Sequence, residues 1–337
     1  MRSSFVIAAL ALGALTGGSA AADPVTLHVG YVVPGADAPL LMFNKAGIAK
    51  HEGQSYTLDA IHFQGTPPMI TALAAGEIDI APLAFSTLSF AVQNAGMSDL
   101  RIIADVFQDG APGYYTNEEM VLKDSPIKTI DDLKGKVIVS NGAGSAVDMA
   151  MRAMFKRHGL EDKKNVTFVE GAFPNMKAML QEHKVDMITG VRPFTADPGL
   201  RAIARTLFTQ REAIGRSEMI VDTARQGFLQ QNRQAVVDYL EDSLRALHWY
   251  SDPANHDEVV KIVSDYTKAP AALYQGWLFV KKGEEGDFYH SPTGTPDLPA
   301  LQANVETQRS LGFLKADLDV KKLADLSYVE EAAKKAR

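Results

Sequence analysis

The sequence has no cysteine among its 337 residues. The chain therefore cannot form disulfides, use a thiolate as a nucleophile, or carry the lipid-modified cysteine that anchors a lipoprotein. It also lacks the thiolate ligands of many zinc and iron sites, and its eight histidines include no pair at metal-ligand spacing within a predicted helix or strand. We therefore expect no metal and no other cofactor.

Long apolar runs are also missing, except for one near the N-terminus. Residues 1–22 combine Arg2, an apolar stretch over 5–15 and small residues over 17–22, which is the pattern of a cleaved secretory signal peptide. The apolar stretch is about half as long as the ~20 residues that span a bilayer. We expect cleavage after Ala20 or Ala22 and a protein that diffuses freely in the periplasm.

Clustered positive charge is absent as well. The formal net charge is −7, and it becomes −8 once the segment with Arg2 is removed, because that segment has no acidic residue. The basic residues are scattered among a larger number of acids, whereas binding of nucleic acid needs a basic patch. We therefore expect no nucleic-acid partner.

What the sequence does contain is a repeated segment. Residues 60–80 (AIHFQGTPPMITALAAGEIDI) and 166–187 (VTFVEGAFPNMKAMLQEHKVDM) share a pattern of strand, turn, helix and strand. The repeat predicts two similar α/β lobes with a ligand cleft between them. Asp79 and Asp186 hold equivalent places in the two copies, which favours a repeated structural role over an acid–base pair.

Two other segments, 118–124 (EEMVLKD) and 217–222 (SEMIVD), resemble each other and mark the points where the chain crosses between lobes. We predict that they form neighbouring strands beside a hinge. Lobe one then comprises 24–113 and 228–337, and lobe two comprises 114–227. Two crossings allow a hinge to bend while each lobe stays folded.

Apolar spacing, together with flanking proline and glycine, predicts the helices. They are expected over 67–75, 146–158, 175–182 and 230–250. Short apolar segments predict buried strands over 27–33, 102–107 and 137–139. Residues 281–299 are rich in glycine and proline and are expected to form a long surface loop.

Ligand sites in such α/β sheets lie beyond the carboxyl ends of the strands. This rule nominates three loops in each lobe, namely 34–39, 64–68 and 85–87 in lobe one and 140–145, 171–174 and 190–194 in lobe two. We expect all six loops to face one cleft.

The loop 140–145 (SNGAGS) is the best candidate for an anion site, because its glycines let the backbone approach a ligand at the start of a helix. Val147 stands where a dinucleotide fingerprint needs a third glycine, so a nucleotide is disfavoured, and an ordinary glycine-rich turn is the alternative. Ser86 and Thr87 either contact the ligand or simply cap the helix that follows them.

Arg192 is the most specific candidate for ligand binding. A guanidinium placed after the last strand of the second repeat can pair bidentately with a carboxylate or sulfonate. The alternative is a salt bridge to a carboxylate at the hinge. Tyr114 and Tyr115, at the predicted crossing, either line the cleft or pack at the hinge.

Catalytic patterns are not evident. Ser145 follows Gly144 but lacks the Gly-x-Ser-x-Gly elbow of serine hydrolases, because Val147 takes the place of the second glycine. We expect that the protein is not an enzyme and that it has no catalytic residues.

Taken together, these segments resemble the nitrate/sulfonate/taurine-type solute-binding proteins of ABC importers. The matching pieces are 29–31 (VGY), 63–66 (FQGT), 72–80 (ALAAGEIDI), 130–137 (IDDLKGKV), the loop ending at Ser145, 185–186 (VD), 192–194 (RPF), 311–314 (LGFL) and 325–328 (DLSY). The resemblance implies the two-lobed periplasmic binding protein fold of the hinge-strand class, an α/β fold with its ligand cleft between the lobes.

The resemblance also implies a set of binding residues. The binding loops of the family fall on Gln64, Gly65, Thr66, Ser86, Thr87, Ser140, Asn141, Ser145, Phe173 and Arg192. The family often has a Trp or an acidic residue where this chain has Arg192. That departure favours an anionic ligand and disfavours a cationic thiamine precursor.

The expected function is that of a periplasmic receptor, a monomer, that closes on a small organic anion such as a sulfonate or an aliphatic or aromatic carboxylate. It would deliver this ligand to the permease of an ABC importer in the inner membrane. One alternative is an enzyme on the same fold, of the menaquinone- or thiamine-pathway type, which the signal peptide and the absence of cysteine disfavour. The other alternative is a sensor subunit that presents its ligand to a membrane receptor. The sequence does not distinguish such a sensor from the receptor of an importer.

Overall fold

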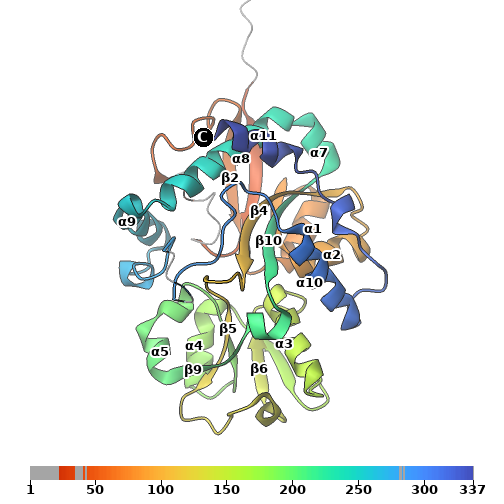
Figure 1. The fold of residues 1–337 in the computed structure, drawn as a ribbon, viewed down its shortest axis with the longest axis vertical. Helices are drawn as coiled ribbons and strands as arrows, with labels where there is room; N and C mark the ends of the chain where they lie inside the picture. The colour runs from red at the N-terminus through yellow and green to blue at the C-terminus, as the bar shows by residue number, and fades with distance from the viewer. Residues whose placement is uncertain (1–22, 35–40, 42–43, 281–282, 284, 337) are drawn as a thin grey trace, which may run out of the picture.

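The structure is a computed structural model that describes residues 23–34, 41, 44–280, 283 and 285–336. The predicted signal peptide lies outside the described residues, as do all but Pro34 of the predicted 34–39 loop and residues 281, 282 and 284 of the predicted 281–299 loop. Two lobes lie one above the other along the longest axis of the molecule (Figure 1).

Lobe one is built on a five-stranded sheet with the strand order β2-β1-β3-β10-β4. Its strands are β1 (Val25–Tyr31), β2 (Tyr56–His62), β3 (Ile80–Ala84), β4 (Leu100–Asp109) and β10 (Ser217–Arg225). β1 pairs in parallel with β2 and β3, whereas β10 is antiparallel to both β3 and β4. The carboxyl ends of β1, β2 and β3 therefore meet at one edge of the sheet.

Lobe two repeats this arrangement. Its strands are β5 (Glu118–Leu122), β6 (Val137–Ser140), β7 (Thr167–Glu170), β8 (Ile188–Gly190) and β9 (Ala204–Thr209). They form the ladders β8-β5-β9 and β6-β7, and a bridge between Ile138 and Met187 joins β6 to the start of β8. The resulting order, β7-β6-β8-β5-β9, matches the order in lobe one.

The repeated sequence segment forms equivalent units in the two lobes. The units are β2-α1-β3 and β7-α4-β8, with α1 at Pro67–Ala75 and α4 at Phe173–Gln181. Asp79 Oδ2 accepts a hydrogen bond of 2.9 Å from the backbone N–H of His28 on β1. Asp186 Oδ2 accepts a bond of 2.9 Å from the backbone N–H of Val137 on β6. Both carboxylates hold the neighbouring strand in place, which confirms their repeated structural role.

The two similar strands are not neighbours, and that prediction was wrong. β5 pairs with β8 and β9 in lobe two, whereas β10 pairs with β3 and β4 in lobe one. Each strand lies fourth in the corresponding order, antiparallel to its partners. Their likeness therefore reflects equivalent places in two similar sheets, and β10 (217–225) belongs to the sheet of lobe one although 114–227 was assigned to lobe two.

The predicted helices are present; α1 has the predicted ends, and the ends of the others are shifted. Lobe one contains α1, α2 (Phe85–Gln93), α7 (Gln226–Gln231), α8 (Arg233–Tyr250), α9 (His256–Thr267), α10 (Leu298–Ser310) and α11 (Ser327–Lys335). Lobe two contains α3 (Ala146–Arg157), α4, α5 (Pro198–Ile203) and α6 (Gln210–Ile214). The single helix predicted over 230–250 is divided at Asn232, where α7 ends and α8 begins. Within the described residues, no helix combines the length and the apolar character needed to cross a membrane.

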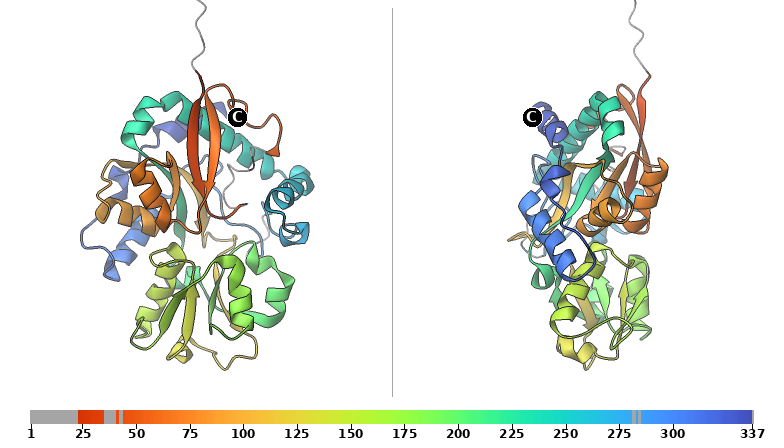
Figure 2. Two further views of the ribbon diagram at one scale, coloured as in Figure 1. Left: turned by 180° about the vertical axis from the view of Figure 1, so that it is seen from behind. Right: turned by 90° about the vertical axis from the view of Figure 1, so that its right-hand side faces the viewer.

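Two adjacent chain segments connect the lobes. The first runs from β4 to β5 and the second from α6 to β10, and the C-terminal helices return to lobe one (Figure 2). Arg211 joins the two segments, since its Nε donates to the Gly110 carbonyl at 3.1 Å and its backbone N–H donates to Thr116 Oγ1 at 3.1 Å. Asp109 also binds the first segment through Thr116 Oγ1 and the Asn117 N–H. Burial raises the pKa of Asp109 to about 6.

Candidate ligand-binding site

Segments of both lobes enclose a cavity of about 80 Å³. A single water molecule needs roughly 10–15 Å³, so a molecule of several non-hydrogen atoms can be held. Lobe one contributes Val32, Val33, Gly65, Thr66, Pro82, Ala84, Phe107, Met219, Ile220 and Phe288. Lobe two contributes Asn117, Asn141, Ser145, Ala146, Val147, Phe173, Val191 and Arg192. The wall is largely apolar.

The cavity lies beyond the carboxyl ends of the strands, where ligand sites of α/β sheets are expected. Val32 follows β1, Gly65 and Thr66 follow β2, and Ala84 ends β3. In lobe two, Asn141 follows β6, Phe173 comes shortly after β7, and Val191 follows β8. The equivalent strand ends of both lobes therefore face one space.

Six of the eleven predicted binding residues line this cavity. They are Gly65, Thr66, Asn141, Ser145, Phe173 and Arg192. Gln64, Ser86, Thr87, Tyr114 and Ser140 are not among the residues that line it. Whether any of these side chains contacts a ligand stays a prediction.

Ser86 and Thr87 lie inside α2 instead of at its N-cap. The helix begins at Phe85 and its N-cap is Ala84, so neither Ser86 nor Thr87 caps it. Thr87 Oγ1 donates a hydrogen bond of 3.0 Å to the Ala84 carbonyl, so its hydroxyl is used within the helix. Both side chains are fully buried, and the Oγ of Ser86 has no hydrogen-bond partner among the described residues.

The loop 140–145 leads into α3 as predicted. Ser145 is the N-cap residue, since its Oγ accepts from the Asp148 N–H at 3.3 Å while it donates to Asn141 Oδ1 at 2.8 Å. The next two residues, Ala146 and Val147, lie in the first turn of α3 and line the cavity. Backbone N–H groups in the first turn of a helix have no partner within the helix and favour negative charge.

Arg192 lies at the cavity wall with its side chain almost completely buried. The guanidinium donates to the Glu285 carbonyl at 2.8 Å, the Thr195 hydroxyl at 3.2 Å and the Gly286 carbonyl at 3.4 Å. It also stacks on the ring of Tyr115, whose centroid is 4.1 Å from Cζ. The predicted alternative was a salt bridge to a hinge carboxylate, but these hydrogen-bond partners are neutral oxygens.

Burial lowers the pKa of Arg192 from its ordinary value. An arginine in a protein nevertheless keeps its charge, because its ordinary pKa is so high. Its hydrogen-bond partners are neutral oxygens, and the nearby carboxylates of Glu118 and Asp287 favour its charged form.

Asn117, which the sequence analysis missed, also lines the cavity. It precedes β5 on the first connecting segment and is 1% exposed. Its Nδ2 donates to Gln210 at 3.3 Å, while its Oδ1 has no hydrogen-bond partner among the described residues. A buried polar atom without a partner beside a cavity is available to a ligand. Neither a motif nor a repeat points to this residue, so only its place at the hinge identifies it.

The lobes are in contact around the cavity. Gly65 of lobe one approaches Asn141 of lobe two so closely that a Cβ on Gly65 would lie 3.1 Å from Asn141 Nδ2. A Cβ on Gly144 would lie 2.7 Å from the ring of Phe90 in α2. Lys156 Nζ of α3 donates to the Ser310 carbonyl at the end of α10 at 2.8 Å. The structure therefore shows the two lobes closed against each other.

Solved structures share this architecture. The alkanesulfonate-binding protein SsuA from Xanthomonas axonopodis pv. citri, bound to MOPS, is 18% identical and superposes with a TM-score of 0.69, over 91% of this chain and 100% of that chain. The periplasmic nitrate-binding protein NrtA from Synechocystis PCC 6803 is 16% identical with a TM-score of 0.71, over 93% and 89%. The desulfurization enzyme DSZB is 14% identical with a TM-score of 0.63, over 93% and 100%.

These identities are low, so the likeness establishes the fold, which is the predicted two-lobed periplasmic binding protein fold. A comparison with curated protein sequences gives no match. The model of the NMT1-like family matches residues 20–264. Because this match covers well over half of the 337 residues, the chain belongs to the NMT1-like family.

Proposed function

We propose that this protein is the periplasmic solute-binding receptor of an ABC importer and that it closes on a small organic anion with an apolar body. The observation that carries the proposal is the cavity between the lobes, where an apolar wall meets the Arg192 cation and the first turn of α3. A ligand that contacts both lobes stabilises the closed arrangement by its differential affinity.

The chemistry of the cavity supports an anion with an apolar part. Phe107, Phe173 and Phe288 contribute aromatic surface that would contact a hydrocarbon group. The guanidinium of Arg192 and the N–H groups of Ala146 and Val147 favour a negative group. The alkanesulfonate-binding and nitrate-binding proteins that share the fold also take anions, and the alkanesulfonate is an organic one.

A binding role is favoured over an enzymatic one, although the fold also occurs in a desulfurization enzyme. Among the described residues that line the cavity there is no histidine and no carboxylate to act as a general base. The hydroxyl of Ser145 is engaged with Asn141. The N-terminal signal pattern supports export, and delivery to a membrane permease follows from the receptor role.

A thermal-shift screen of refolded, ligand-free protein tests the ligand class. Alkyl and aryl sulfonates, aliphatic and aromatic carboxylates and nitrate are compared with neutral amides of the same shape, such as benzamide beside benzoate. A ligand selective for the folded state raises the melting temperature. We expect a rise with one class of organic anion and none with its amide. Equal shifts with the amides, or shifts with uncharged compounds alone, would contradict the proposal.

Two substitutions at Arg192 separate the role of its charge from its role in closure. Arg192→Gln removes the charge, whereas Arg192→Lys keeps the charge but loses the planar fork that binds several oxygens. We expect Arg192→Gln to weaken binding of the anion found in the screen by more than about 1.5 kcal/mol, measured by calorimetry. Arg192→Lys should retain part of that affinity. An unchanged affinity in Arg192→Gln would remove the cation from the binding site.

A further inference from the structure

The α8 helix lies at the end of lobe one that is farther from lobe two (Figure 1). One side of this helix carries several charged residues. Asp238, Glu241, Asp242 and Arg245 follow one another at spacings of three and four residues and so share one side of the helix. The three carboxylates are almost completely buried, and they outnumber the one guanidinium. The chain segment that carries His51 packs against this face.

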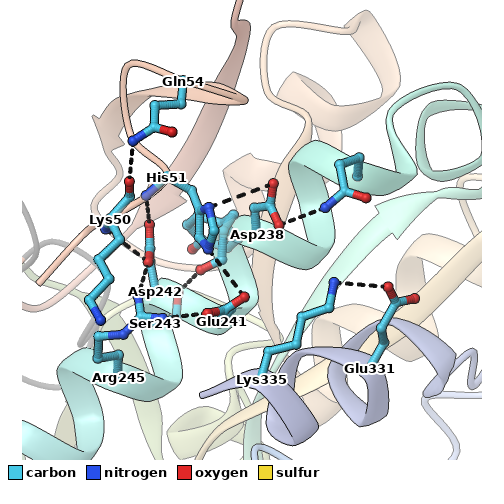
Figure 3. Close-up of polar contacts among 12 residues, drawn as sticks. Lys50, His51, Gln54, Asp238, Glu241, Asp242, Ser243, Arg245, Glu331 and Lys335 are labelled. Atoms are coloured by element: carbon cyan, nitrogen blue, oxygen red, sulfur yellow. Dashed lines mark hydrogen bonds and ion pairs between the residues drawn. The ribbon is translucent and has the colours of Figure 1, made fainter. Parts of the chain in front are cut away.

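His51 lies between two of these carboxylates (Figure 3). Its Nε2 is 3.1 Å from Glu241 Oε2, and its Nδ1 is 4.0 Å from Asp238 Oδ2. Despite the short distance to Glu241, the buried Nε2 has no hydrogen-bond partner among the described residues. The imidazole therefore has a buried nitrogen without a hydrogen-bond partner beside a carboxylate oxygen.

Other side chains hold the remaining oxygens of these carboxylates. Arg245 donates to Glu241 Oε1, and Gln234 donates to Asp238 Oδ1 at 2.7 Å. Each carboxylate thus keeps one oxygen fixed and turns the other toward His51. Metal ligands in proteins are typically oriented by outer hydrogen bonds of this kind.

The backbone of His51 is held as firmly as the carboxylates are. Asp242 accepts hydrogen bonds from the backbone N–H of Lys50 at 3.0 Å and from that of His51 at 2.8 Å. The hydroxyl of Tyr56 donates to the same carboxylate at 2.9 Å. The loop is therefore fixed on the helix without help from the imidazole, which leaves the ring available to a ligand.

We propose that His51, Asp238 and Glu241 form a binding site for a divalent transition-metal cation such as Zn²⁺. One ligand atom from each residue lies within 4.8 Å of the others. With metal–ligand bonds of about 2.1 Å, a separation of 3.1 Å between His51 Nε2 and Glu241 Oε2 corresponds to an angle of about 95° at the metal. One imidazole and two carboxylates suit Zn²⁺ and its neighbours in the first transition row, and water would complete the coordination.

The site lies outside the cavity between the lobes and would act on the stability of lobe one. A bound cation would tie the His51 loop to α8 and neutralise part of the negative charge on this face. The sequence argues against a metal because no two of its histidines share a metal-ligand spacing within one helix or strand. Here one ligand comes from a loop and two come from a distant helix, which only the folded chain brings together.

The alternative for the same geometry is a protonated His51 that pairs with the two carboxylates and binds no metal. A calorimetric titration with Zn²⁺ distinguishes the metal site from this metal-free alternative. The protein for it carries no histidine tag and is first treated with EDTA and dialysed. We expect one equivalent of Zn²⁺ to bind and the melting temperature to rise. Binding of no zinc would overturn the proposal.

Variants assign the binding to these residues. His51→Gln and Asp238→Asn should each weaken Zn²⁺ binding by at least about tenfold. His158→Gln is the matched control, because His158 pairs with the single carboxylate of Asp131 at 2.8 Å in lobe two. Undiminished binding in both His51→Gln and Asp238→Asn would also overturn the proposal. If a variant fails to fold, Co²⁺ can be bound to the wild-type protein in place of Zn²⁺, and its visible spectrum shows which atoms are its ligands. We expect a spectrum with a nitrogen ligand. A spectrum of an ion bound by oxygen atoms alone would contradict the proposed site.

Discussion

Glu119 is a carboxylic acid enclosed within lobe two. Its side chain on β5 is fully buried, Thr189 donates a hydrogen bond of 2.8 Å to its Oε2, and its Oε1 has no partner among the described residues. Burial disfavours the charged form and raises the pKa of Glu119 to about 8. The neutral acid is therefore the form that suits the folded protein near neutral pH.

This shift predicts a stability that falls as the pH rises. The folded protein keeps the proton of Glu119 up to a pH of about 8, whereas the unfolded chain releases it near the ordinary pKa of 4.5. The contribution is complete below the unfolded pKa and is lost as the pH rises toward the folded pKa, by up to about 1.4 kcal/mol per pH unit. Glu119→Gln should make the free energy of unfolding less dependent on pH between 5 and 8, as measured with urea.

The control for this experiment is Glu77→Gln, which changes an exposed residue. It should leave the pH dependence of the wild-type protein unchanged. Parallel curves for Glu119→Gln and the wild type would show that Glu119 does not titrate in this range.

Arg192 shows how far a single residue can be predicted from the sequence. Its position after the last strand of the second repeat places it at the cavity, as expected. Its hydrogen-bond partners at 285 and 286 come from a segment more than ninety positions away that carries no pattern, so the sequence does not reveal them. The same limit hides Asn117, whose environment depends on the packing of both connecting segments.

At the scale of secondary-structure elements, the contact between α2 and α3 joins the lobes. Gly144 has a φ angle of +80°, and its α-carbon faces the ring of Phe90. An added Cβ would lie 2.7 Å from that ring, closer than real side chains pack. The glycine is therefore required both by the turn that starts α3 and by the approach of the two helices.

Gly144→Ala should weaken ligand binding, because the added methyl group pushes α2 and α3 apart and disfavours the closed state. Gly135→Ala is the matched control, since Gly135 has a φ of +79° with no atom near its missing Cβ. Each substitution should destabilise the fold by about 1 kcal/mol through its backbone conformation. Only Gly144→Ala should also reduce the affinity measured by calorimetry, and an equal affinity in the two variants would argue against this closure contact.

Secondary structure follows from the sequence where local signals are strong. Pro67 and Gly76 mark both ends of α1, which spans 67–75 as predicted. The break at Asn232 between α7 and α8 lacks such a signal, because the apolar spacing continues through it. The likeness of β5 and β10 led to a wrong prediction, because similar sequences in two strands indicate only that the strands have similar surroundings. Neighbouring strands of one sheet have similar surroundings, and so do equivalent strands in two similar lobes.

At the scale of the whole molecule, two adjacent segments form the connection between the lobes. Arg211 ties them together through Gly110 and Thr116, so the lobes should move as rigid units about this point. A ligand that bridges the cavity should therefore make the protein more compact. Small-angle X-ray scattering should show a smaller radius of gyration when the anion found in the screen is added, and an unchanged radius would mean that the free protein is already closed.

The architecture of the whole chain was the most predictable feature. The internal repeat predicts two lobes and a cleft, because two equivalent units can share a space at their strand ends. The limits of the lobes, 24–113 with 228–337 and 114–227, remain a prediction except that β10 lies in the first sheet. That exception arises because β10, the fourth strand in the sheet order of lobe one, comes after the chain has returned from lobe two.

The place of β10 between β3 and β4 also bears on the order in which the molecule can fold. All the strands of lobe two lie between residues 118 and 209, so this lobe is complete in one continuous stretch of chain. Lobe one has four of its strands before residue 110 but needs β10 to join them. During synthesis, the edges of β3 and β4 that pair with β10 therefore stay unpaired until more than two hundred residues have been made. We expect lobe two to fold first, and lobe one to complete its sheet only after β10 has been made.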